Sequence, residues 1–152
     1  MDKPLRKEFE VQWSDLDPNR HMRHSAYNDY AAHMRLKIFE EAGINMKLME
    51  ELNIGPILFR EETTFLREIG MEGNIILTVA LSKSRADASR WSFHHEIFRP
   101  DGIKAAKITV DGAWLDLDKR KLAHPPKEVI DLMMSLPKTQ DFELLVPHET
   151  KK

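Results

Sequence analysis

The sequence predicts an α+β domain in which one antiparallel sheet of five strands wraps around a single long central helix. Three observations favour this class: a short strand-like run comes early in the chain, a long helical pattern follows, and four strand patterns joined by short turns come next. A chain of 152 residues has the length of one domain with its own core. We therefore expect a single domain over residues 1–152, with its core at about 5–136 and a polar C-terminal tail.

The first strand is predicted at residues 9–13, where apolar and polar side chains alternate. Asp17-Pro18-Asn19 follows as a breaker, because proline lacks an N–H and restricts the residue before it. The long helix is expected to run to about Ala42 and to end at Gly43, with Ser25 as a candidate N-cap. Its predicted apolar face holds Tyr27, Ala31, Met34 and Ile38, and is widened by Ala32, Leu36 and Phe39.

The rest of the chain is expected to form short helices and hairpins. The predicted strands cover residues 57–67, 74–84, 89–99 and 104–116, and the predicted short helices cover 46–52 and 126–136. Turn residues separate consecutive strands, so we expect these strands to pair antiparallel as hairpins. One helix cannot cover both faces and both edges of such a sheet. We therefore expect a homo-oligomer, a dimer or a tetramer, that joins sheet edges or packs sheets face to face.

Composition narrows the classes of function. A net charge of -2 and a pI near 6.4 give no general attraction to nucleic acid or to an anionic membrane. The sequence has no cysteine, which excludes a thiol nucleophile, a Cys-ligated zinc and a disulfide framework. The first residues are charged, and no apolar run approaches the length of a membrane span. We expect a soluble cytoplasmic protein whose partner is a small molecule or another protein.

The stretch between the first strand and the long helix gathers the candidate catalytic groups. Its two acids and two histidines precede a helix start, where free N–H groups and the positive dipole end can hold a carboxylate or an oxyanion: Asp15, Asp17, His21 and His24. A metal site is the less favoured alternative, because a proline turn separates the acids from the histidines. No Gly-x-Ser-x-Gly, His-Glu-x-x-His or phosphate-loop pattern occurs, so serine hydrolase, zincin and nucleotidase functions have no support.

This stretch resembles the hotdog-fold acyl-CoA thioesterases, in particular the 4-hydroxybenzoyl-CoA thioesterase-like group. The run Val11-Gln12-Trp13-Ser14-Asp15-Leu16-Asp17-Pro18 is similar to the family's strand and acid, and Tyr27 follows ten residues after the second acid. His21 and Arg35 stand where many members have a histidine and an arginine. The chain departs from the family at Arg20-His21-Met22-Arg23-His24, where many members have Gly-His-Val-Asn-Asn. The resemblance implies a hotdog fold, in which the sheet wraps around the helix.

The resemblance also implies an activity, the hydrolysis of an acyl thioester of coenzyme A or acyl carrier protein, with no cofactor and no metal. Asp17 would attack the thioester carbon or activate water, and the backbone N–H of His24 would bind the oxyanion. The structural alternative for Asp17 is a common Asp-Pro turn. For the His24 side chain, orientation of substrate or proton transfer stands against simple exposure at the helix start.

Other residues are assigned supporting roles. Asp15 and His21 are expected to brace the loop, and Tyr27 is a candidate contact for the substrate. The best cluster of cations for coenzyme A phosphates flanks one strand turn, where a solvated hairpin is an equal alternative: Lys83, Arg85 and Arg90. His94 and His95 are neighbours on a strand and point to opposite faces, so they cannot share one site.

Two further functions stay open. The first is a non-catalytic subunit that binds acyl thioesters or serves as a scaffold. The second is a hotdog hydratase, which is weaker because the spacing between Asp17 and His21 is too short for its Asp and His. Partners of either kind would be acyl thioesters and a second copy of the chain, with no nucleic acid and no membrane.

Overall fold

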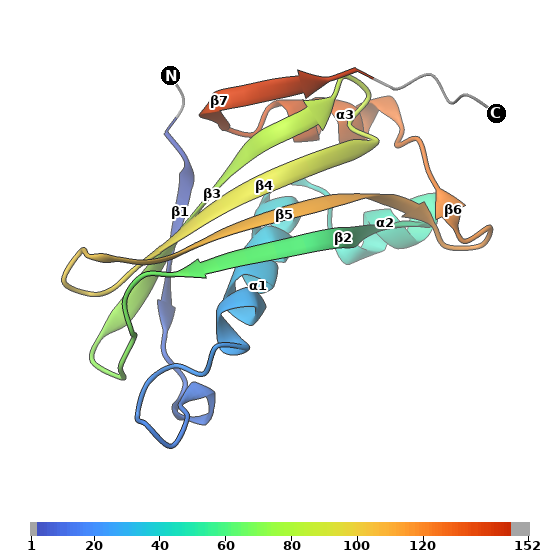
Figure 1. The fold of residues 1–152 in the computed structure, drawn as a ribbon. Helices are drawn as coiled ribbons and strands as arrows, with labels where there is room; N and C mark the ends of the chain where they lie inside the picture. Colours follow the sequence, from blue (N-terminus) through green and yellow to red (C-terminus); the bar gives the residue numbers. More distant parts are fainter. Residues whose placement is uncertain (1–2, 147–152) are drawn as a thin grey trace.

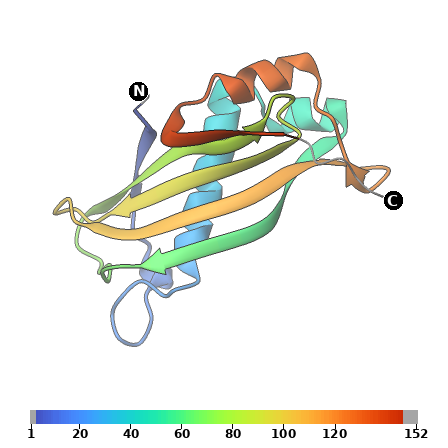
Figure 2. The same ribbon diagram turned by 45° about the horizontal axis from the view of Figure 1, so that its top comes forward.

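The computed structural model describes residues 3–146 of the chain. Its helices are α1 (Ala26–Ala42), α2 (Met46–Leu52) and α3 (Lys127–Met134), with one 3-10 turn at Trp13–Asp15. The strands, in chain order, are β1 (Leu5–Glu10), β2 (Ile54–Phe65), β3 (Asn74–Arg85), β4 (Arg90–Phe98), β5 (Lys104–Asp116), β6 (Lys121–Leu122) and β7 (Lys138–Leu145). Figure 1 and Figure 2 show a curved sheet with the long helix α1 on one face. The prediction of an antiparallel sheet around one long helix is confirmed.

The order of the strands corrects one part of the prediction. The main path of the sheet is β1-β3-β4-β5-β2, with antiparallel pairing throughout. β3, β4 and β5 form consecutive hairpins as predicted, but β2 pairs with β5 and not with β3. The two hairpins use both sides of β4, so the two strands that precede them in the chain occupy the outer edges. β1 takes the free edge of β3, and β2 takes the free edge of β5.

The first strand lies earlier than predicted. β1 covers Leu5–Glu10, and Glu10 stands opposite Asn74, the first residue of β3. Beyond that point β3 has no backbone to pair with, so the chain turns away. Trp13, predicted to be in the strand, lies in the 3-10 turn and is 77% exposed. The available length of the neighbouring strand therefore outweighs the alternating pattern of residues 9–13.

The core lies between α1 and the concave face of the sheet. Five of the predicted apolar positions of α1 are buried: Tyr27, Ala31, Met34, Ile38 and Phe39. Ala32 is partly buried and Leu36 is 48% exposed, so the apolar face is narrower than predicted. Aromatic rings from α1, β4 and β5 meet in the core as a cluster of Phe39, Phe93, Trp91 and Trp114. Gly112 on β5 permits this packing, because a Cβ at that position would collide with the Trp91 ring and the Ile57 carbonyl oxygen.

The chain after α3 also differs from expectation. Residues 138–145, predicted only as a polar tail, form β7, which pairs parallel with the end of β3. β1 covers β3 only as far as Val79, which leaves backbone groups of residues 81–85 open on that edge. β7 pairs with them, and the N–H of Leu81 donates to the carbonyl of Pro137 at 2.8 Å. No helix in the described part of the chain is long and apolar enough to cross a membrane.

Candidate active site at the start of helix α1

Backbone hydrogen bonds within the loop between β1 and α1 fold it into a turn. The N–H of Asp17 donates to the carbonyl of His21, and the N–H of Arg20 donates to the carbonyl of Asp17, both at 2.9 Å. Met22 is 4% exposed, and its N–H donates to the carbonyl of Ile69 at 2.6 Å. The loop is thus anchored to the connection between β2 and β3. The residues of the candidate site are therefore held by an anchored turn just ahead of α1.

The carboxylate of Asp17 is half-buried and serves this turn with one oxygen. Its Oδ1 accepts hydrogen bonds from the backbone N–H groups of Asn19 at 2.9 Å and His21 at 3.3 Å. Its Oδ2 has no hydrogen-bond partner among residues 3–146. The turn therefore orients the carboxylate and leaves one oxygen available to a ligand.

Tyr27 is in the first turn of α1 and feels the charge of Asp17. The residue is 3% exposed, and its ring packs edge-on against Phe65 with centroids 4.9 Å apart. Burial raises the pKa of the Tyr27 phenol, and the negative charges of Asp17 and Glu68 raise it further. Little of the Tyr27 side chain is open to a ligand, and its contact with substrate stays a prediction.

Asp15 has both carboxylate oxygens engaged. Its Oδ2 accepts a 2.6 Å hydrogen bond from the Tyr30 hydroxyl, and its Oδ1 accepts one of 3.2 Å from the Arg23 guanidinium. Burial and the bond to Asp15 raise the pKa of Tyr30 to about 12. These contacts join the loop to the first turns of α1.

The two histidines of the loop differ in their surroundings. His21 places Nε2 at 3.2 Å from a carboxylate oxygen of Glu68, and its backbone takes part in the turn. His24 is exposed, and within residues 3–146 neither its ring nor its backbone N–H has a hydrogen-bond partner. It lies just ahead of Ala26, the first residue of α1. The free N–H of His24 is a donor at the helix start, on the same loop as Asp17.

Ser25, which was expected to be the N-cap of α1, forms no side-chain cap. Its hydroxyl accepts a hydrogen bond from the Arg23 guanidinium instead.

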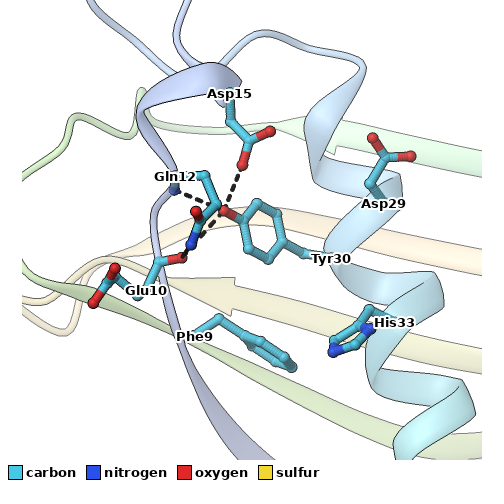
Figure 3. A pocket seen from close by; sticks show the side chains of 7 residues that line it. All are labelled: Phe9, Glu10, Gln12, Asp15, Asp29, Tyr30 and His33. Carbon is cyan, nitrogen blue, oxygen red and sulfur yellow. Dashed lines mark hydrogen bonds between the residues drawn. The ribbon is translucent and has the colours of Figure 1, made fainter.

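A hollow opens beside the loop, between β1 and α1 (Figure 3). It has a volume of about 350 Å³, and its lining residues are Phe9, Glu10, Gln12, Asp15, Asp29, Tyr30 and His33. The Tyr30 hydroxyl is its central polar group, with hydrogen bonds to Asp15 and to the backbone of Gln12. Three carboxyl side chains make the rim acidic, and Asp17 is not among its lining residues. No group of three or more potential metal ligands comes together within the described ranges.

The cations predicted to bind coenzyme A phosphates lie far from the Asp17 loop of the same chain. Lys83, Arg85 and Arg90 flank the turn between β3 and β4, at the upper right of Figure 1, whereas the loop lies at its bottom. From Asn74, beside the end of β1, to Lys83 the strand extends about 30 Å. The guanidinium of Arg90 packs over the Phe59 ring at 5.0 Å. The structure does not bring these cations and Asp17 into one site within a chain.

The two neighbouring histidines of β4 point to opposite faces, as predicted. His94 contacts the side chains of Thr109 and Glu96 on the outer face. His95 is fully buried on the concave face and meets the guanidinium of Arg35 from α1. The sequence alone did not predict this pair, although Arg35 is a charged residue among the apolar positions of α1 and stands where similar proteins have an arginine.

A model of one protein family matches this chain over residues 11–132, and its description is the thioesterase-like superfamily. The chain belongs to the thioesterase-like superfamily. The match covers the loop with Asp17 and His24, α1 and four of the five strands of the main sheet, and it leaves out β1. Family membership supports thioester hydrolysis as the general chemistry of this thioesterase-like protein. A search of curated proteins found no match.

Solved structures share the hotdog fold of this thioesterase-like chain. A 1,4-dihydroxy-2-naphthoyl-CoA thioesterase from Synechocystis is 13% identical, with a TM-score of 0.77 over 88% of this chain and 98% of its own. A hypothetical protein from Staphylococcus aureus, solved in complex with CoA, is 17% identical, with a TM-score of 0.80 over 97% of this chain and 98% of its own. A probable thioesterase from Escherichia coli is 16% identical, with a TM-score of 0.71 over 84% and 95%. At these identities the likeness establishes the fold.

Proposed function

We propose that this member of the thioesterase-like superfamily hydrolyses an acyl thioester of coenzyme A or acyl carrier protein, with Asp17 as the catalytic carboxylate. One observation carries the proposal: Oδ1 of Asp17 is held by two backbone N–H groups, while Oδ2 has no partner among residues 3–146. A nucleophile or base must be positioned and yet free on the reacting atom. Family membership supports the reaction class, and the assignment of Asp17 to it is ours.

The chemistry can follow either of two routes at this carboxylate. In the first, Oδ2 of Asp17 attacks the thioester carbon, the C–S bond breaks, and water then hydrolyses the mixed anhydride. In the second, Oδ2 takes a proton from a water molecule that attacks the same carbon. In both routes the thiolate leaves and is protonated, and the exposed His24 ring can supply that proton. The unpaired backbone N–H of His24 receives the oxyanion.

The turn around Asp17 also favours a second candidate, a subunit that binds acyl thioesters without hydrolysing them. Two backbone hydrogen bonds to Oδ1 would suffice to explain an aspartate at this position. The two candidates differ in whether the carboxylate has to be charged, since an asparagine can accept the same two bonds.

Asp17→Asn separates the two candidates. The amide oxygen preserves the turn, so the variant should stay folded and oligomeric, while thiol release from acyl-CoA should fall by a factor of about 10² or more. Asp15→Asn is the matched control, because Asp15 lies in the same loop with both oxygens engaged. We expect it to retain most of the activity. Full activity of Asp17→Asn across acetyl, medium-chain, long-chain and aryl acyl-CoA would refute the assignment, and thioester binding without turnover by the wild type would favour the second candidate.

We further propose that the active form is a homodimer or homotetramer joined along β2. Within the described chain, β2 is the outermost strand beside β5, and its side chains include Phe59 and Phe65, each about half exposed. Antiparallel pairing of two β2 edges would place the end of one strand beside the start of the other. The turn between β3 and β4 of a second copy would then approach the Asp17 loop of this chain. Such a dimer offers a route by which Lys83, Arg85 and Arg90 of a second copy could reach coenzyme A phosphates.

Light scattering tests this assembly directly. We expect the mass of a dimer or a tetramer at micromolar concentration. A monomer with full thioesterase activity would contradict a site that draws cations from a second copy. Salt sensitivity of the KM for acyl-CoA, lost in the Arg85→Gln variant, would support phosphate binding by this cluster.

A further inference from the structure

A cation is buried beneath the sheet and has no carboxylate partner among residues 3–146. Arg35 on α1 is 6% exposed, and its NH1 lies 2.9 Å from Nε2 of His95. A guanidinium can only donate, so Nε2 accepts and the opposite ring nitrogen carries the proton. That nitrogen, Nδ1, lies 3.0 Å from the carbonyl oxygen of Thr78 and donates to it. His95 is therefore neutral, and it orients Arg35 without balancing its charge.

No carboxylate within the described part of the chain forms an ion pair with Arg35. The acid that acts on it electrostatically is Glu61 of β2, which is exposed to solvent and lies beyond ion-pair distance. Burial lowers the pKa of Arg35 to about 10 and, with the positive charge of Arg35, lowers the pKa of His95 to about 3. An unpaired buried cation is unfavourable unless something else satisfies it.

Arg35 lines a cavity of about 170 Å³ between α1 and β2. The other lining side chains are apolar or aromatic: Ala32, Leu36, Phe39, Pro56, Leu58 and Trp91. The indole N–H of Trp91 is buried and has no acceptor within residues 3–146, and the same holds for neighbouring Trp114. Arg35 and the two indoles are thus all hydrogen-bond donors, and the two indole N–H groups have no acceptor among residues 3–146.

Helix α1 and strand β2 run side by side from the Asp17 loop to this cavity. Tyr27 packs on Phe65, and the next contact joins Asn28 to Thr63 through their side chains at 3.2 Å. The cavity follows farther along both elements. From His24 to Arg35 the helix rises about 16 Å. A thioester held at the helix start would need an acyl group of about that length to reach Arg35 along α1.

We propose that this cavity binds a distal carboxylate on the acyl group, so that the preferred substrates are thioesters of dicarboxylic acids. The inference rests on the proposed function and names the substrate class of that site. A carboxylate supplies a further acceptor and the negative charge that Arg35 does not find among residues 3–146, and the guanidinium can bind it through two parallel bonds. The apolar lining accepts the methylene groups next to it. A plain fatty acyl chain would leave the buried cation unpaired.

Matched pairs of acyl-CoA substrates test the proposal with the unmodified protein. The pairs are butyryl with succinyl, octanoyl with suberoyl, and dodecanoyl with dodecanedioyl thioesters, which differ only in the terminal carboxylate. We expect kcat/KM for the carboxylated member to exceed that of its neutral partner by at least about tenfold for the longest pair, which alone approaches the length to Arg35, because one charged hydrogen bond accounts for such a factor. Equal values in every pair would overturn the proposal.

Variants assign the preference to Arg35. Arg35→Met should reduce the ratio of carboxylated to neutral activity by about tenfold or more, and Arg35→Lys should restore part of it. Lys37→Met is the matched control, because Lys37 is an exposed cation on the same helix, and it should leave the ratio unchanged. An unchanged ratio in Arg35→Met would overturn the proposal.

Binding measurements separate this proposal from the proposed function. Calorimetry with Asp17→Asn should give a lower Kd for dodecanedioyl-CoA than for dodecanoyl-CoA, and adding Arg35→Met should abolish the difference. That result would support the cavity even if the wild type hydrolysed no thioester at all. Equal Kd values, together with dissociation of the oligomer in Arg35→Met, would overturn it and identify a carboxylate of a second copy as the partner of Arg35.

Discussion

The hydroxyl of Tyr30 donates a 2.6 Å hydrogen bond to Oδ2 of Asp15 and so joins helix α1 to the loop that carries Asp17. Removing the hydroxyl in Tyr30→Phe leaves a largely buried carboxylate oxygen without its donor. We expect the free energy of unfolding to fall by about 1–3 kcal/mol. Urea denaturation of the wild type, Tyr30→Phe, Asp15→Asn and the double variant measures the coupling. Strictly additive losses would show that the two groups stabilise the fold independently.

The two roles of Asp17 predict different results for two substitutions. Asp17→Asn retains an oxygen for the N–H groups of Asn19 and His21, so its free energy of unfolding should stay within about 0.5 kcal/mol of the wild type. Asp17→Ala removes that acceptor and should cost about 1–2 kcal/mol in addition to activity. Thermal and chemical denaturation of both variants give the comparison. Equal stability of the two would mean that the turn does not depend on this side chain.

Arg20 occupies the left-handed region, with φ 64, in an exposed part of the loop. Glycine reaches this conformation without steric cost, whereas a β-branched residue does not. Arg20→Gly should therefore raise the free energy of unfolding by up to about 1 kcal/mol, and Arg20→Val should lower it by about 1–2 kcal/mol. Differential scanning calorimetry of both variants measures the two shifts. A loss of stability in Arg20→Gly would mean that the arginine side chain contributes contacts that outweigh its backbone strain.

Acid should destabilise the fold through His95. Burial and the Arg35 charge lower its pKa from 6.5 to about 3 in the folded state, while the unfolded chain keeps the ordinary value. Between these two pKa values the unfolded chain binds a proton at His95 and the folded chain does not. The contribution of His95 to the free energy of unfolding is therefore present above pH 6.5 and is lost as the pH falls toward 3. Urea denaturation at a series of pH values measures the slope. His95→Asn should make that slope shallower, and an unchanged slope would assign the acid sensitivity to other groups.

Local patterns predicted most elements because helices and hairpins depend on residues close together in the chain. β5 runs over Lys104–Asp116 and α2 over Met46–Leu52, as predicted, and Gly43 ends α1 with φ 101. Local patterns could not predict which strands the edge strands pair with. β2 pairs with β5 rather than β3, and β7 pairs with the part of β3 that β1 leaves open. Both choices depend on which edges the hairpins leave free.

The same distinction between local sequence and tertiary packing applies to the candidate site. The sequence by itself determined that two acids and two histidines stand at the start of one long helix, because these residues are neighbours in the chain. Only the tertiary structure decided which oxygen of Asp17 stays free, that Lys83 lies at the other end of the sheet, and that Arg35 meets His95, sixty positions away. The last contact arises because α1 packs across the concave face of the sheet. That packing is set by the summed burial of many apolar side chains, which no short stretch of sequence contains.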